Sequence, residues 1–243
     1  MADGTGIAGQ WERLAAWFRS SGQPAADSTT PSRSFPSMDE RGPWGRGGSY
    51  PVASENGDYL MLTPRDKNVP SVMIPNTVGA KGFEVGPAYD IVHQDHTYQA
   101  KLDTDIPFDQ NAALIGATIA KHPVPELPWS PPEQPASDTG TRNDALYGDY
   151  VKSFTVASPD PSKYTDMTVN YTVSGEHRLD EGYVIRYGEK QPDGTTSLIS
   201  YGEGNALVQH PLSPAHLVNS PLWNTSHRTI RDDVKAQMSP TTP

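Results

Sequence analysis

The stretch from residue 166 to residue 205 decides the fold: DMTVNYTVSGEHRLDEGYVIRYGEKQPDGTTSLISYGEGN. Apolar and polar residues alternate from Met167 to Val173, which is the period of two that indicates a strand with one buried face. The same alternation predicts a second strand from Tyr183 to Tyr187 and a third from Thr196 to Tyr201. Between these two, Gln191-Pro192-Asp193-Gly194 is a turn sequence, because Pro presets φ and Gly accepts a positive φ. The stretch therefore predicts an antiparallel meander that ends in a hairpin with a short loop.

Four side chains in this stretch could form a catalytic site. His177 lies in the connection between the first two strands, and Arg186 lies on the second strand, on the face opposite Tyr183. Tyr201 and Glu203 lie at the end of the third strand. A His, an Arg and a carboxylate can serve together as acid or base and as anion stabiliser. The alternative is that His177 is a surface loop residue and Arg186 a solvated strand residue.

The composition indicates a loop-rich protein with a modest core. Hydrophobic residues make up 35% of the 243 residues, and 21 Gly with 24 Pro account for nearly a fifth of the chain. The 11 Tyr, five Trp and five Phe are enough to build that core. The net charge of −10 disfavours a protein that binds phosphate backbones nonspecifically.

The chain contains no Cys, which excludes disulfides, cysteine-zinc sites and cysteine nucleophiles. The N-terminus lacks the basic region followed by an apolar run that is typical of a signal peptide. A membrane-spanning helix needs about 18 or more consecutive apolar residues, and no segment approaches this length. We therefore expect a protein without a membrane span that is made in the cytoplasm without a signal peptide. Export by a one-step secretion system stays open.

Four segments differ in composition. Residues 1–49 hold one short amphipathic helix and a lead-in rich in Pro, Gly and Ser. Residues 50–122 contain short strands cut by turns and end in a helix, and residues 150–243 contain the meander and a last helix. Residues 123–149 begin with PVPELPWSPPEQP, which has six prolines and is expected to be extended. This segment could be a linker, a PxxP ligand or a strap laid over the body.

Six further strands are predicted on short β-branched, aromatic or alternating runs. They are residues 59–63, 71–74, 82–85, 89–93, 97–102 and 150–158. Between residues 50 and 101 these runs recur about every ten residues with Gly or Pro between them, which is typical of an antiparallel meander.

Two helices are predicted to cover the strands. The first runs from Asp109, a candidate cap, to His122, and Pro123 ends it. The second, Ser220 to Met238, begins at Pro221. Its inward-facing residues are Leu222, Trp223, Ile230 and Val234. The predicted fold is α+β, a mainly antiparallel β-sheet with two or three covering helices and long Pro/Gly-rich loops.

One cluster of potential metal ligands is visible. His93, Asp95 and His96 could converge on a turn, but their spacing matches no established metal motif. A metalloenzyme would need a further ligand, for which His122 is the candidate. The alternative is a pair of solvated or hydrogen-bonded histidines, so we expect neither a metal nor a cofactor.

The segment NYTVSGEHRLDEGYVIRYG, followed by a polar hairpin and YGEGN, resembles the C-terminal domains of bacterial polymorphic toxins and related secreted effectors. The resemblance covers Tyr150 to Gln209 and is carried by a loose motif. It implies a small α+β body behind a Pro/Gly-rich lead-in and a role in interbacterial competition. It also implies that His177, Arg186 and Tyr201 stand where such domains commonly carry active-site groups.

Two hypotheses on function follow. The first is a secreted effector or toxin, in the form of a metal-free hydrolase or transferase that acts on a nucleotide or RNA. In it His177 is the acid or base, Arg186 holds an anionic group, and Tyr201 or Glu203 orients the substrate. A cognate immunity or chaperone protein would be its partner, and the acidic charge argues against a nuclease.

The second hypothesis is a non-enzymatic binding or structural module, such as a phage, secretion or adaptor component. The enzyme requires its side chains to converge on one cleft, and the module does not.

Overall fold

The computed structural model describes residues 52–53, 58–80, 95–127, 130–146, 148–173, 175–177, 181–205 and 216–238. Within them, all pairs between strands are antiparallel and two helices cover the larger of two sheets. The α+β class with a mainly antiparallel sheet is thereby confirmed. The predicted helix in residues 1–22 and the predicted strands 82–85 and 89–93 lie outside the described residues.

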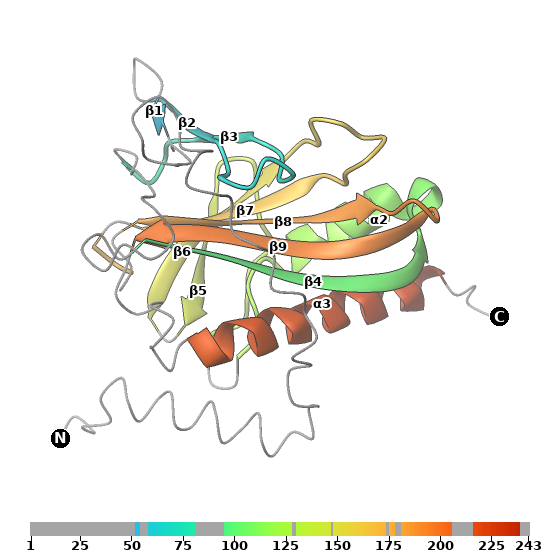
Figure 1. Cartoon of the computed structure of the whole chain (residues 1–243). Helices are drawn as coiled ribbons and strands as arrows, with labels where there is room; N and C mark the ends of the chain where they lie inside the picture. Colours follow the sequence, from blue (N-terminus) through green and yellow to red (C-terminus); the bar gives the residue numbers. More distant parts are fainter. Residues whose placement is uncertain are drawn as a thin grey trace.

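The larger sheet has six strands in the order β4-β9-β8-β7-β6-β5 (Figure 1). They are β4 (Asp95–Pro107), β5 (Thr141–Leu146), β6 (Asp149–Val156), β7 (Met167–Thr172), β8 (Gly182–Lys190) and β9 (Thr195–Asn205). The hairpin between β8 and β9 has the predicted turn, in which the Gly194 N–H donates to the Gln191 carbonyl at 2.9 Å and Gly194 has a φ of 82°. The register that follows from this turn pairs Arg186 with Ser200.

A smaller sheet of three strands covers one face of the larger sheet (Figure 1). It consists of β1 (Val52–Ala53), β2 (Tyr59–Leu62) and β3 (Val72–Pro75). Buried and exposed residues alternate along β2, as expected for a strand with one face in the core. The core between the two sheets is aliphatic and aromatic and includes Leu60, Leu62, Ile74, Val169, Tyr171, Ile185, Tyr187 and Ile199.

Helices α2 (Phe108–Lys121) and α3 (His216–Met238) cover the opposite face of the larger sheet (Figure 1). A second core lies there, made of Ile106, Ile115, Ile119, Leu198, Ile230 and Val234. Leu198 and Ile199 are neighbours on β9 and belong to the two different cores, because successive strand residues point to opposite faces. The larger sheet is therefore the middle layer of three.

The prediction of one buried face for the meander is wrong for β7. All six residues of this strand are buried. Val169 and Tyr171 face the smaller sheet, while Thr168 and Asn170 face the helices. The polar residues of the alternation therefore mark a second, polar interior and not a solvated face.

Residues 136–149 contain the edge strand β5, where the sequence analysis predicts no strand. Its sequence TRNDAL lacks the alternation of apolar residues that indicates a strand with one buried face. An edge strand keeps part of its surface in water, so it does not need this alternation. Residues 123–127 and 130–136, here called the strap, run along the body of the protein. The Ala136 N–H donates to the Ala120 carbonyl at 2.8 Å, and the Asn143 side chain bonds both backbone groups of Gln134.

Strand β4 is longer than the predicted strand 97–102 and pairs with β9 from Asp95↔Asn205 to Pro107↔Thr195. The first strand of this pair belongs to segment 50–122 and the second to segment 150–243. The two segments therefore share one sheet.

Both predicted helices are present, but their N-termini differ from the prediction. Asp109 does not cap α2, whose N-cap is Pro107 without a side-chain hydrogen bond; its carboxylate instead accepts from Lys190 at 2.6 Å. Helix α3 begins at His216, so Pro221 lies inside it. The inward residues Leu222, Trp223, Ile230 and Val234 are all buried, as predicted. None of the helices described in the structure has both the length and the apolar character to cross a membrane.

Candidate functional site

Arg186 is buried between the larger sheet and α3, with 1% of its surface exposed. Its strand alternates, so Ile185 and Tyr187 enter the core under the smaller sheet and Arg186 points to the helical side. Thr168 on β7 and Ser200 on β9 are its partners on the neighbouring strands. The alternative of a solvated Arg186 is therefore wrong, because α3 and the strap cover a face that the strand pattern alone leaves open.

The guanidinium of Arg186 is held by neutral groups. Its Nε donates to Ser200 Oγ at 3.2 Å and its Nη2 to Ser226 Oγ on α3 at 2.7 Å. Its Nη1 donates to the carbonyl of His122, the residue that ends α2. The Trp223 ring lies 4.9 Å from Cζ. In the described residues, no carboxylate lies within ion-pair distance of this guanidinium.

Burial lowers the pKa of Arg186 to about 10, and the nearby Glu133 and Tyr98 act in the opposite direction. The guanidinium therefore keeps its charge at neutral pH. A buried charge with few charged neighbours is costly, since water no longer solvates it.

A serine–histidine pair adjoins the arginine. Ser200 Oγ, which accepts from Arg186, lies 2.8 Å from His227 Nε2. His227 is 1% exposed, and burial, reinforced by the Arg186 charge, holds its pKa well below the ordinary value. The imidazole is thus neutral at physiological pH. No group in the described part of the chain pairs with its Nδ1, so the acid that completes a catalytic triad is missing there.

Tyr98 and Trp223 form the aromatic wall of the site. Their rings are stacked at 6.5 Å between centroids, and Tyr98 lies over Gly202, where an added Cβ would meet the ring at 2.4 Å. Trp223 is buried, whereas Tyr98 is partly exposed. Burial raises the pKa of the Tyr98 hydroxyl, so the exposed part of this residue is not its polar end.

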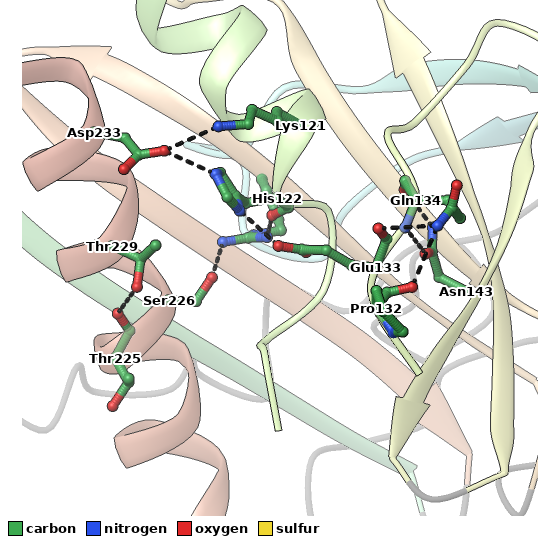
Figure 2. Close-up of polar contacts among 11 residues, drawn as sticks. Lys121, His122, Pro132, Glu133, Gln134, Asn143, Thr225, Ser226, Thr229 and Asp233 are labelled. Atoms are coloured by element: carbon green, nitrogen blue, oxygen red, sulfur yellow. Dashed lines mark hydrogen bonds and ion pairs between the residues drawn. The ribbon is translucent and has the colours of Figure 1, made fainter. Parts of the chain in front are cut away.

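A group of charged side chains closes the site between the end of α2, the strap and α3 (Figure 2). His122 Nδ1 lies 2.5 Å from Glu133 Oε1 on the strap, and its Nε2 lies 3.0 Å from Asp233 Oδ2 on α3. Lys121 donates to the same Asp233 oxygen at 3.2 Å. The hydrogen bond with Glu133, the largest cause, raises the pKa of His122, and Asp233 adds to it. His122, Glu133, Asp233 and Lys121 are called the latch below.

Tyr201 and Glu203 lie on the other face of the sheet from Arg186. Tyr183 donates to Glu203 Oε2 at 2.7 Å, the Arg65 N–H donates to Oε1 at 2.7 Å, and the Tyr201 hydroxyl also donates to Oε1. Burial raises the pKa of Glu203, although these donors oppose the rise. The carboxylate thus ties the β2–β3 connection to the sheet, and it does not meet Arg186.

His177 lies in the connection from β7 to β8 and is partly exposed. The proposed set of His177, Arg186, Tyr201 and Glu203 is therefore divided. Arg186 is on the helical face, while Tyr201 and Glu203 are under the smaller sheet. The four side chains do not form one constellation around a single cleft.

The alternative metal site falls largely outside the description. His93 is not among the described residues, and the side chains of Asp95 and His96 are not described either. His122, its candidate fourth ligand, is bound between two carboxylates. Within the described ranges, no three His, Asp or Glu side chains form a cluster that could hold a metal ion.

The sequence analysis did not identify Ser200, Ser226 and His227 as site residues. A signal for two of them was present: Trp223, Ile230 and Val234 define the inward stripe of α3, and positions 226 and 227 fall on it at helical spacing. A polar residue on an inward stripe predicts a polar interior. For Ser200, the β8–β9 turn sets the register that pairs it with Arg186.

No family model matches the chain, and no curated protein does. Solved structures with some similarity include Ara h 8.0201, with a TM-score of 0.39, 17% identity, and 58% of this chain and 99% of that chain covered. An Arabidopsis thaliana member of the major latex protein family has a TM-score of 0.35 and 11% identity, over 60% of this chain and 98% of its own. Norcoclaurine synthase from Thalictrum flavum has a TM-score of 0.30 and 9% identity, over 58% and 91%. At these TM-scores, the likeness indicates nothing about what this chain binds or does.

Proposed function

We propose that the protein is a binding module that takes a small anionic ligand at Arg186, between the sheet and α3. The observation that carries the proposal is the buried guanidinium whose hydrogen-bond partners are two serine hydroxyls and one carbonyl. Arginine presents planar, paired donors that fit a carboxylate or a phosphate. An anion there would replace weak dipolar partners by a charged one in a low dielectric.

The surroundings support an anion. Ser200 and Ser226 are hydroxyls and His227 is a neutral imidazole, so these groups can donate hydrogen bonds to an anion beside the guanidinium. Trp223 and Tyr98 offer ring faces beside the guanidinium. A few convergent polar groups beside aromatic walls are typical of small-molecule sites.

A secreted effector with hydrolase or transferase activity is the second candidate. The observation in its favour is that Ser200 lies 2.8 Å from a neutral imidazole and within hydrogen-bond distance of Arg186, so a hydroxyl, a base and a cation meet at one point. In that case the ligand is a substrate. Arrest of bacterial growth by the full chain, and its loss in a folded Ser200→Ala variant, would distinguish this candidate. Growth that the wild-type chain leaves unaffected, in cytoplasm and periplasm, would eliminate it.

The binding proposal is tested on the full chain by isothermal titration and thermal shift with inorganic phosphate, phenyl phosphate and benzoate. We expect at least one of these anions to bind. We expect Arg186→Lys to weaken its affinity by roughly tenfold or more, about 1.4 kcal/mol, because lysine keeps the positive charge but lacks the planar, paired N–H donors of the guanidinium. Arg142→Met is the matched control, since Arg142 is an exposed arginine that pairs with Glu176 at the sheet edge.

Circular dichroism of each variant separates loss of binding from loss of folding. Binding of none of the three anions at millimolar concentration would contradict the proposal. So would equal weakening by Arg186→Lys and Arg142→Met.

A further inference from the structure

We infer that the ligand of the Arg186 site is a polyhydroxylated anion, such as a sugar acid or a sugar phosphate. This inference rests on the proposed anion-binding function and adds the chemical class of the rest of the ligand.

The inference starts from three polar atoms that have no hydrogen-bond partner in the part of the chain that the structure describes. They are Thr168 Oγ1, Asn170 Oδ1 and His227 Nδ1. The exposed fractions of these residues are 0%, 3% and 1%. Buried polar atoms are nearly always paired, and each unpaired one costs free energy. We take three such atoms, on residues around one guanidinium, as partners for the polar groups of a ligand.

All three atoms belong to residues that flank the guanidinium. Thr168 is the direct strand partner of Arg186 on one side. On the other side, His227 is hydrogen bonded to Ser200, which accepts from Arg186 Nε. Asn170 lies two residues along β7 on the same face, and its Nδ2 donates to the Pro123 carbonyl at 2.7 Å. Pro123 follows the residue whose carbonyl accepts from Arg186, so the unpaired atoms and the charge lie in one layer.

The three atoms require different hydrogen-bond partners. Asn170 Oδ1 only accepts, Thr168 Oγ1 donates and accepts, and His227 Nδ1 donates when Ser200 donates to Nε2. Glu133 Oε2, which is also unpaired in the described structure, only accepts. A hydroxyl group can donate and accept, so a chain of hydroxyls satisfies all of these atoms while an apolar ligand satisfies none. An anionic head for Arg186 and hydroxyls for its neighbours define the proposed class.

The test compares gluconate with hexanoate on the full chain by isothermal titration. Both have a carboxylate on six carbons, and only gluconate carries hydroxyls. We expect gluconate to bind at least roughly tenfold more tightly. Glucose 6-phosphate against inorganic phosphate repeats the comparison for a phosphate head.

Thr168→Val tests whether the Thr168 hydroxyl contacts the ligand, because valine has nearly the same shape as threonine but no hydroxyl. We expect its melting temperature without ligand to equal or exceed that of the wild type, since the lost Oγ1 has no described partner. We expect its gluconate affinity to fall several-fold and its hexanoate affinity to stay unchanged. Thr196→Val is the matched control on the same face: Thr196 Oγ1 donates to the Ile106 carbonyl at 3.0 Å, so this variant should lose stability and keep its gluconate affinity.

The outcomes separate the two levels of the proposal. If gluconate, glucose 6-phosphate and the simple anions all fail to bind, the anion-binding function fails and this inference fails with it. If hexanoate and inorganic phosphate bind as tightly as their hydroxylated counterparts, in an Arg186-dependent way, the anion-binding function stands and the polyhydroxylated class is wrong. A Thr168→Val variant with unchanged gluconate affinity, or with a lowered melting temperature, also overturns the inference.

Discussion

Two buried ionisable residues face opposite sides of the same sheet and differ in how they are satisfied. Glu203 accepts from two tyrosine hydroxyls and one backbone N–H, so its oxygens have partners within the protein. Arg186 has neutral partners and neighbours with unpaired atoms. The first pattern is typical of a structural anchor and the second of a binding site, although both residues looked equally suited to catalysis in the sequence.

Replacing Glu203 by Gln should change how stability depends on pH. The raised pKa of Glu203 means that the folded protein binds this proton more readily than the unfolded chain does. Its contribution to stability is therefore fully present below the ordinary value of 4.5 and is lost as the pH rises through the raised pKa. Gln cannot titrate, so the stability of Glu203→Gln relative to the wild type should rise from acid to neutral pH. Urea unfolding at several pH values measures this, and parallel curves for the two proteins would contradict it.

Gly202→Ala should destabilise the protein through the Tyr98 ring. The new Cβ would lie 2.4 Å from two ring atoms, so the ring must move out of its stack with Trp223. We expect a loss of about 1–3 kcal/mol in the free energy of unfolding. The cost should nearly vanish in a Tyr98→Ala background, which removes the ring. Equal costs in the two backgrounds, measured by denaturant unfolding, would show that the strain arises elsewhere.

At the scale of elements, the latch joins three segments that are distant in sequence: the end of α2, the strap and the C-terminal part of α3. His122 contributes in two ways, because its carbonyl accepts from Arg186 while its ring bridges Glu133 and Asp233. A change in the ring's charge therefore acts on the segments that enclose the site.

The latch should weaken as the pH rises. The hydrogen bond with Glu133, and then Asp233, raise the pKa of His122 above 6.5, while burial and Lys121 oppose the rise. A raised pKa contributes stability that is present below the unfolded value and is lost as the pH rises through the folded value. We expect an NMR titration to place the pKa of His122 above 6.5, and Asp233→Asn to lower it. An unchanged pKa in Asp233→Asn would mean that Asp233 does not contact the ring in solution.

The sequence pattern predicted the strands and helices that have one clear periodicity. It did not predict burial at positions where the cover comes from another layer of the fold. The meander and both covering helices carry alternation or helical spacing, and a Pro-Asp-Gly turn marks the hairpin. Strand β5 was missed because its sequence is polar, and the burial of Arg186 because its cover comes from residues far along the chain. The separation of Arg186 from Tyr201 could have been predicted. The turn after β8 pairs Arg186 with Ser200, which places Tyr201 on the other face.

At the scale of the whole molecule, one sheet unites the segments that composition separates. Strand β4 forms one edge of this sheet and β5 the other. Neither the part before the strap nor the part after it contains all of the sheet and its cover, so the described layers depend on both parts.

A fragment of residues 123–243 should therefore not fold on its own. It lacks β4 and α2, which leaves β9 as an unpaired edge and exposes Leu198 and the helical core. We expect no cooperative thermal transition by circular dichroism, whereas the full chain should unfold cooperatively. Adding residues 58–122 as a separate chain should restore the transition if the two parts associate. A cooperative transition of the fragment alone would contradict the shared sheet.

The pairing of β4 with β9 has a consequence during synthesis. Asp95 pairs with Asn205, about 110 positions later in the chain. At about 5–20 residues per second, a ribosome needs roughly 5–20 seconds to make the partner strand after β4 has been made. During that interval the backbone of β4 has hydrogen-bond donors and acceptors but no partner strand. The nascent chain is then most exposed to mispairing, so a chaperone that shields β4 until translation reaches β9 would raise the yield of folded protein.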